Sequence, residues 1–577
     1  MDNIWKIKPS APEEFVIQNK NYSITALQLF WNRGLKDSES IEKFLNPSLA
    51  DLFSPNLMLN MAKGAERIVS GIKNNERMAI FGDYDTDGIC SSVILTKFFK
   101  RIGFENFDVF IPNRFKGGYG LITDKVRQIA QDGVKIIITV DCGITDIEEV
   151  ELAKGLGVEV LIFDHHLPHT DLPQTLIVDS HQPGDNYPFK HLTATAVVYK
   201  LVQVLAEQLN FPYKQSLEKE FLDLIAIATV ADVAPIFGEN RIFVKFGLEQ
   251  LKNTQNLGLK SLLAVSGLDK YKTYNSYHIG FVIAPRLNAV GRVEHATPAG
   301  RIEDTDYSFE LLMTENDNEA QVWAEKIDNF NVERQRQVEE IYNEVSEIIQ
   351  KQGGPEKVIF FGDPKWSKGV VGVVAGKLKD KWHRPVFIYS QTEEGTSLGS
   401  ARSIPGFNLV EIMDGARDCF VECGGHSEAA GFVIKNEDLE RCHQFLEEQA
   451  QTLLKEEDLI PTLEIEASLE PEDITMNFWD LIRQFEPFGK TNPNPIFLMR
   501  NVCLDKMRSV GKNGNHLKLA IVKNGRSFNA ISFNSAEKLK HLTEGMMVDL
   551  VFVLRENEWQ GQKYLDFELV DTKEIKN

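Results

Sequence analysis

The chain has 577 residues, of which 43% are hydrophobic and 25% charged, and its formal net charge is −21. This length indicates three or four domains. The chain has no run of about 18 apolar residues, no signal-peptide pattern at its first residues and only six cysteines, so we expect a cytoplasmic protein with neither a membrane span nor a disulfide framework.

The first part of the chain predicts a helical prelude over residues 1–50, followed by a large α/β domain over residues 51–305. From about 55 to 235, short apolar runs alternate with helical patterns. This alternation favours a mostly parallel sheet with helices on both faces. Residues 236–305 follow as helices, with a loop near residues 284–292.

An acidic motif ends the first predicted strand of this domain. Residues 78–82 form a short apolar run, and Asp83, Asp85 and Asp87 follow within five residues. Gly88 then leads into a helical pattern. Carboxylates crowded at a strand end repel each other and are costly to desolvate, so they indicate a bound divalent cation. Oxygen ligands favour Mg²⁺ or Mn²⁺.

Further acids follow four other apolar runs that we interpret as strands: Asp141 after residues 135–140, Asp164 with His165 and His166 after 158–163, Asp179 after 176–178, and Asp232 after 225–230. A single acid in such a place is usually a turn residue or a helix N-cap. Five such positions and a histidine pair together predict a metal site at the carboxyl edge of the sheet. The histidine nitrogens favour Mn²⁺ over Mg²⁺.

The second half of the chain divides into three predicted parts. A long polar helical pattern at residues 309–351 indicates a connecting helix, which we assign to a segment spanning residues 306–352. A second α/β domain covers residues 353–455, where Cys419, Cys423 and Cys442 are interpreted as free thiols rather than zinc ligands. Short β-type runs over residues 460–577 predict a small barrel or sandwich. Its basic and aromatic residues fit either a solvated basic surface or a binding surface for single-stranded nucleic acid; they are Lys506, Arg508, Lys512, Lys518, Lys523, Arg526, Phe528 and Phe533.

Four motifs in this order resemble the DHH phosphoesterase superfamily: residues 82–88, the Asp-Cys-Gly of 141–143, the Asp-His-His of 164–166, and Ala231-Asp232. Further stretches at residues 111–120, 284–292, 399–403, 424–431 and 486–489 resemble the RecJ family of bacterial exonucleases. The resemblance spans nearly the whole chain. It implies a multidomain α/β fold, with a parallel-sheet DHH domain, a long connecting helix, an α/β DHH-associated domain and a C-terminal OB-fold β-barrel.

The resemblance also implies a catalytic site. In such a site two Mn²⁺ or Mg²⁺ ions are held by Asp85, Asp87, Asp141, His165 and Asp232, with Asp141 as the bridge. Asp83 is a further candidate ligand, and His166 faces the scissile phosphate. The substrate-binding residues implied in the same way are Arg114, Tyr119, Arg286, Asn288, Ser400, Arg402, Gly424, Gly425 and His426. In one departure from the family pattern, Ser367 stands where a histidine is usual.

The function implied is 5′→3′ hydrolysis of single-stranded DNA to 5′-mononucleotides, in DNA repair and recombination. Two other functions stay open: a phosphodiesterase for short oligoribonucleotides or cyclic dinucleotides, and a non-catalytic replication scaffold. The predicted barrel favours the exonuclease, because relatives with short substrates resemble only the two catalytic lobes. Family members often act with a single-strand-binding protein and a helicase, and we expect a monomer.

Overall fold

The computed structural model describes residues 3–112, 120–211, 214–293 and 307–575. Two compact units are present: residues 51–459 form one, and residues 1–50 together with 460–577 form the other. Of the helices in the described ranges, none combines the length and the apolar character that crossing a membrane requires.

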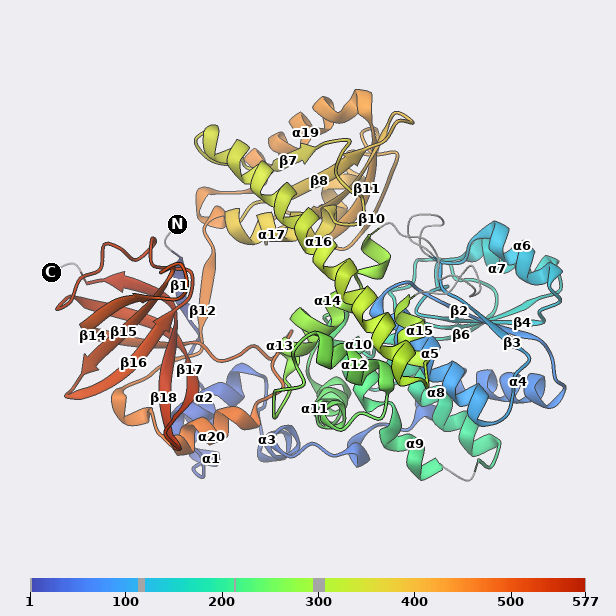
Figure 1. The fold of residues 1–577 in the computed structure, drawn as a ribbon, viewed down its shortest axis with the longest axis horizontal. Helices are drawn as coiled ribbons and strands as arrows, with labels where there is room; N and C mark the ends of the chain where they lie inside the picture. The colour runs from blue at the N-terminus through green and yellow to red at the C-terminus, as the bar shows by residue number, and fades with distance from the viewer. Residues whose placement is uncertain (1–2, 113–119, 212–213, 294–306, 576–577) are drawn as a thin grey trace. The chain divides into compact units, whose positions relative to one another are not determined.

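The larger unit begins with a five-stranded parallel sheet in the order β3-β2-β4-β5-β6 (Figure 1). Its strands are β2 Met78–Gly82, β3 Phe107–Phe110, β4 Ile136–Val140, β5 Glu159–Phe163 and β6 Leu176–Val178. β2 and β4 are buried along their whole length, which explains their unbroken apolar sequences. Its helices are α4 Met61–Lys73, α5 Thr86–Arg101, α6 Thr123–Gln131, α7 Ile147–Gly155 and α8 Ala194–Gln208. The parallel sheet is therefore confirmed, and Asp83, Asp141, Asp164 and Asp179 follow its strands directly.

The strand predicted at residues 225–230 is wrong, because these residues lie in helix α10, Leu222–Ala231. Leu222 to Thr229 are all buried, so the segment is apolar all round and carries no helical periodicity to distinguish it from a buried strand. Asp232 is the C-cap of this helix. The neighbouring helices are α9 Lys214–Glu220, α11 Gly238–Lys252, α12 Leu257–Val265, α13 Ser276–His278, the π-helix η3 Ile279–Ile283, α14 Ala284–Leu287 and α15 Tyr307–Met313.

The long helical pattern at residues 309–351 is two helices rather than one. α15 ends at Met313, and α16 runs from Asp317 to Lys351. Asn316 separates them, because its side chain accepts hydrogen bonds from the backbone N–H groups of Asn318 and Glu319 and so caps α16. α16 packs against α12 and α15 before it, and against α17 (Val371–Trp382) after it.

The second sheet of this unit has the order β10-β11-β9-β8-β7. Its strands are β7 Ile359–Gly362, β8 Val386–Gln391, β9 Thr396–Arg402, β10 Glu422–Gly425 and β11 Ala429–Lys435, and its other helices are α18 Leu409–Asp414 and α19 Leu439–Leu453. Cys419, Cys423 and Cys442 form no disulfide; Cys419 and Cys442 are buried, whereas Cys423 is exposed.

The smaller unit is built from both ends of the sequence. Strand β1, Ile4–Ile7, pairs in parallel with β12, Thr462–Ile465. Helices α1 Glu13–Gln18, α2 Ile24–Asn32 and α3 Ser38–Leu45 share one hydrophobic core with α20, Met476–Gln484, and with the barrel. The stacked rings of Phe30 and Phe485, 5.1 Å apart, join the two ends of the chain in this core.

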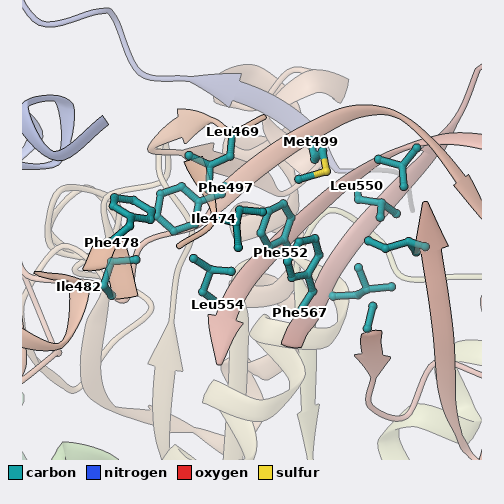
Figure 2. Packing of buried hydrophobic residues seen from close by; sticks show 14 of the residues in the cluster. Leu469, Ile474, Phe478, Ile482, Phe497, Met499, Leu550, Phe552, Leu554 and Phe567 are labelled. Atoms are coloured by element: carbon teal, nitrogen blue, oxygen red, sulfur yellow. The ribbon is translucent and has the colours of Figure 1, made fainter. Parts of the chain in front are cut away.

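Strands β13 Ala467–Ser468, β14 Phe497–Val510, β15 His516–Lys523, β16 Arg526–Ser532, β17 Met547–Trp559 and β18 Gln562–Glu574 form the barrel. It closes because β14 pairs with β17 as well as with β15. Figure 2 shows the rings of Phe497, Phe552 and Phe567 filling its interior. The predicted C-terminal barrel is therefore confirmed.

Candidate metal and substrate site

A strand, a turn and a helix bring the first three acids together. Asp83 follows β2 and is buried, and Asp85 is the N-cap of α5. The Asp85 carboxylate accepts the backbone N–H groups of Asp87 and Gly88 at 2.8 and 3.2 Å. A Cβ on Gly88 would lie 2.6 Å from the backbone nitrogen of Asp83. Glycine is therefore required here, since the first helical turn folds directly against the end of the strand.

A second helix N-terminus fixes the carboxylate of Asp87. Its Oδ2 accepts the backbone N–H of Ala194 at 2.7 Å, and its Oδ1 accepts that of Thr195 at 2.9 Å. Both donors lie in the first turn of α8, where backbone N–H groups lack helical partners and the helix dipole favours negative charge. Asp87 is held in one orientation in this way.

Asp141 lies at the end of β4 in a strained backbone conformation. Its φ angle is +66°, in the left-handed region, which aspartate tolerates better than most residues. The side chain is buried, and Asp141 Oδ1 lies 3.1 Å from Nε2 of His165. The same nitrogen lies 3.6 Å from Oδ2 of Asp87. His165 therefore stands between the two carboxylates.

Asp164 orients His166 and the chain after β4. Its Oδ1 lies 2.7 Å from Nδ1 of His166, and its Oδ2 accepts the backbone N–H of Ile144 at 3.1 Å. Although burial opposes ionisation, the hydrogen bond from His166 helps to hold the pKa of Asp164 at about 2. Against the effect of its own burial, the Asp164 carboxylate raises the pKa of His166 to about 9. The pairing with Asp164 therefore orients the His166 ring and favours its protonated form.

Three groups of side chains in the described part of the chain could each hold a metal ion. They are Asp83, Asp85 and Asp141; Asp87, His165 and Asp232; and Asp141, His165 and His166, and the ligand atoms of each group lie within 4.8 Å of one another. Asp141 and His165 each belong to two groups, so the groups form adjoining cation positions. The carboxylate and imidazole donors fit Mn²⁺ or Mg²⁺.

Without a bound cation, ionisation of the carboxyl groups in this cluster is unfavourable. Desolvation raises the pKa of Asp141 well above its usual value, and the nearby carboxylates of Asp87 and Asp85 raise it further. Desolvation also raises the pKa of Asp87, and it raises the pKa of Asp232 to about 7 although His165 opposes it. Metal binding removes this penalty, because positive charge favours the ionised carboxylates.

Asn288 contacts the acidic loop. Its Oδ1 accepts the backbone N–H of Thr86 at 2.9 Å and the Thr86 hydroxyl at 2.7 Å. Two residues earlier, Arg286 donates to Oδ1 of Asp328 on α16 at 2.8 Å. Asn288 was expected to bind substrate, and the structure places its side-chain oxygen on the residue between Asp85 and Asp87.

Arg334 on α16 was missed in the sequence analysis. Its Nε is buried and has no hydrogen-bond partner among the described residues. Burial lowers the pKa of its guanidinium, and the charge of Arg286 lowers it further. The guanidinium groups of Arg286 and Arg334 therefore lie close enough to repel each other, and Arg286 is the one that pairs with Asp328. The proximity depends on the packing of α14 against α16, for which the local sequence has no signal.

A second group of predicted residues meets in the second sheet. Ser400 on β9 is opposite Gly431 on β11, which in turn is opposite Gly424 on β10. Arg402 donates from Nη1 to Oγ of Ser400 at 2.8 Å. A Cβ on Gly372 would lie 3.3 Å from Nη2 of Arg402, so the first turn of α17 lies against this arginine.

The remaining predicted residues have simpler settings. Gly425, with φ +147°, ends the exposed strand β10, and the backbone N–H of His426 donates to the carbonyl of Ala429. Ser367 accepts the backbone N–H of Gly369 at 3.4 Å and so belongs to the turn before α17. Arg114 and Tyr119 lie outside the described residues.

Comparison with known proteins agrees with this architecture. Family models described as DHH family, N-terminal domain, as DHHA1 domain and as RecJ OB domain match residues 77–229, 355–453 and 465–571. Fold and site together define a phosphoesterase of the DHH class.

The single-stranded-DNA-specific exonuclease RecJ of Bacillus subtilis is 38% identical over 563 residues, which are 97% of this chain and 69% of that protein. The RecJ of Escherichia coli K12 is 29% identical over 93% of this chain and 94% of its own. The crystal structure of RecJ from Thermus thermophilus in complex with Mn²⁺ matches with a TM-score of 0.82 and 27% identity, covering 100% of this chain and 80% of that one. The chain belongs to the RecJ family.

Proposed function

We propose that this chain is a metal-dependent exonuclease that hydrolyses single-stranded DNA from its 5′ end to 5′-mononucleotides. The observation that carries this proposal is the 3.1 Å contact between Nε2 of His165 and Oδ1 of Asp141, which joins two candidate cation positions in a member of the RecJ family. The barrel is a second support, because phosphodiesterases for very short substrates have no need of a separate strand-binding domain. Such an activity would serve in DNA repair and recombination.

In this proposal Asp85, Asp87, Asp141, His165 and Asp232 hold two Mn²⁺ or Mg²⁺ ions, with Asp83 beside them. When bound, the ions supply positive charge for the phosphate and lower the pKa of a bound water. The chain supplies the other parts. Thr195 and Ala194 orient Asp87, and Asp164 holds the imidazolium of His166. The proton on Nε2 of His166 is then available to an oxygen of the scissile phosphate.

The 5′ polarity of the reaction is assigned to Ser400 and Arg402. Arg402 offers a planar fork that matches phosphate oxygens, and the N-terminal turn of α17 beside it adds a favourable dipole. Gly424 and Gly425 let the backbone of β10 approach the same group closely. A terminal phosphate carries more charge and one more free oxygen than an internal phosphodiester, so this group of donors distinguishes a 5′ end from the middle of a strand.

Strand capture is assigned to the barrel. Arg508 on β14 lies directly opposite Lys518 on β15, and like charges in such a pair are destabilising unless an anion lies between them. Lys506 is exposed two residues from Arg508. By contrast, Lys523 forms an ion pair with Glu470 at 2.6 Å and contributes less to this surface.

The test is hydrolysis by the full-length protein after metal removal and return of Mn²⁺. Three substrates are compared: 3′-labelled single-stranded DNA, its duplex and a dinucleotide. We expect stepwise shortening of the single strand from its 5′ end, abolished in Asp141→Ala with an unchanged circular dichroism spectrum. Cleavage of the dinucleotide alone, or near-normal turnover by Asp141→Ala, would overturn the proposal. A single-strand-binding protein and a helicase as partners, the monomeric state and the cytoplasmic location stay predictions.

A further inference from the structure

Two large aromatic rings are exposed on the segment between α12 and α14. The side chains of Tyr277 and Phe281 are 62% and 69% exposed. Their rings stack on each other, with centroids 4.8 Å apart and planes inclined by 22°. A single exposed aromatic residue needs no explanation, whereas two stacked rings form a flat apolar surface that water solvates poorly.

The segment that carries these rings packs against α10, whose C-cap is Asp232. Phe281 lies in the π-helix η3, a distortion that is frequent at functional sites. A Cβ on the neighbouring Gly280 would lie 3.5 Å from Val230, two residues before Asp232. In the other direction the same segment leads through α14 to Asn288, which contacts Thr86 in the acidic loop.

The residue that follows Asp232 has a strained backbone. Val233 has a φ of +55° and is 60% exposed. A β-branched residue in the left-handed region is an outlier, and such strain persists where the surrounding structure fixes it, often at a functional site. η3 packs against α10, the helix that ends just before this turn.

We propose that Tyr277 and Phe281 form a stacking platform for the nucleobases of the substrate strand next to the metal site. This inference rests on the proposed function. The ions that the proposed function places at the site would attract phosphate oxygens and not the bases, so the bases need a contact of another kind. Base–aromatic stacking is such a contact, and it tolerates any sequence because every base has a π-face. A duplex cannot use the platform, since its base faces are already covered by their neighbours.

The test compares full-length Phe281→Ala and Tyr277→Ala with Phe281→Trp. The control is Tyr271→Ala, an exposed tyrosine whose ring contacts His278 and neither ring of the platform. Each protein is assayed on a 5′-phosphorylated single strand, and on the same strand with abasic residues at its first positions. Loss of one stacked base corresponds to a KM about 10-fold higher. We expect that rise for the two alanine variants on the normal strand, with kcat little changed, and no rise on the abasic strand. Phe281→Trp should restore the KM, and Tyr271→Ala should match the wild type.

Wild-type KM values for both alanine variants on the normal strand would overturn the platform. So would a concentration-dependent dimer that is lost in Phe281→Ala at an unchanged KM, because the rings would then pair with a second copy. Binding of a strand that carries 2-aminopurine is measured, without added metal, by the quenching of its fluorescence. This measurement separates the test of the platform from the test of the proposed function. If wild-type protein quenches the probe and Phe281→Ala does not, the platform stands even where hydrolysis of single-stranded DNA fails.

Discussion

Oδ1 of Asn288 accepts hydrogen bonds from both the backbone N–H and the hydroxyl of Thr86, a residue 202 positions earlier in the chain. Thr86 is buried and lies between Asp85 and Asp87. The position of the acidic loop therefore depends on a helical segment that contributes no candidate metal ligand itself.

Asn288→Ala is expected to weaken Mn²⁺ binding about 10-fold, the lower range for loss of a group that orients a metal ligand. The buried Thr86 N–H and hydroxyl would lose their acceptor, which costs about 1–3 kcal/mol in the free energy of unfolding. Calorimetric titration with Mn²⁺ and thermal melting measure the two effects. Thr86→Val, which keeps the backbone bond, should lie between wild type and Asn288→Ala; equal Mn²⁺ affinity in all three proteins contradicts the prediction.

Gly88→Ala is expected to abolish activity, because the new Cβ would meet the backbone nitrogen of Asp83 at 2.6 Å and displace the acidic loop. The matched control is Gly376→Ala in α17, where a Cβ meets nothing within 4 Å. Alanine is favoured over glycine inside a helix by about 1 kcal/mol, so the control should be as stable as wild type or more so. Turnover and melting temperature are compared for the two variants, and an active Gly88→Ala would refute the requirement for glycine.

Asp146→Asn is expected to stabilise the protein at alkaline pH. Burial raises the pKa of Asp146 from 3.8 to about 6, so the folded state binds its proton more tightly than the unfolded state. Ionisation therefore destabilises the fold as pH rises from about 4 to 6, by at most about 3 kcal/mol. Asparagine keeps an acceptor for the Leu121 N–H and removes this penalty.

Chemical denaturation of wild type and Asp146→Asn at pH 8 and pH 4 measures the predicted stabilisation. The gain in the free energy of unfolding should be present at pH 8 and vanish toward pH 4. Asp171→Asn, at an exposed position, should change it by less than about 0.5 kcal/mol at either pH. A gain that is the same at both values would rule out the ionisation of Asp146 as its cause.

The double variant Arg508→Ala/Lys518→Ala is expected to weaken binding of long single-stranded DNA and to reduce its dependence on salt. Each lost phosphate contact lowers the slope of log K against log salt by about 0.7, so two contacts lower it by about 1.4. Fluorescence anisotropy at several NaCl concentrations measures the slope. Lys523→Ala is the control, since Glu470 already neutralises that lysine. The same slope for double variant and control would remove this face of the barrel from the binding surface.

Arg402→Ala is expected to raise the KM for 5′-phosphorylated strands about 10-fold or more, because a charge-assisted hydrogen bond contributes about 1.5–3 kcal/mol. The KM for 5′-hydroxyl strands should change little. Arg417→Ala, in the same lobe but exposed and paired with Asp414, should behave as wild type. An equal loss on both kinds of end would make Arg402 a general strand contact.

The acids after β2, β4 and β5 could be predicted from sequence because buried strands of a parallel sheet are short, apolar and bounded, and their carboxyl ends meet at one edge. Asp232 was predicted as a ligand at the end of a strand, whereas it caps the end of a helix. Its buried helix α10 is apolar on every side and so resembles a buried strand.

The contributions of Asn288 and Arg334 could not be derived from local patterns. Both depend on how α14 and α16 pack on other elements, and hydrophobic periodicity does not encode such tertiary contacts. The union of residues 1–50 with the barrel escaped prediction for the same reason.

Because the chain is synthesised from its N-terminus, residues 1–50 of the smaller unit are made long before residues 460–577. Lys8 and Glu466, whose side chains form an ion pair at 3.1 Å, are 458 residues apart, and β1 has no partner until β12 has left the ribosome. Residues 51–459 can therefore fold while translation continues. The apolar faces of α1 and α2, including Phe15 and Phe30, stay exposed throughout that time. We expect the nascent chain to need a chaperone at its N-terminal segment longer than at its nuclease domain, and slowed translation to prolong that need.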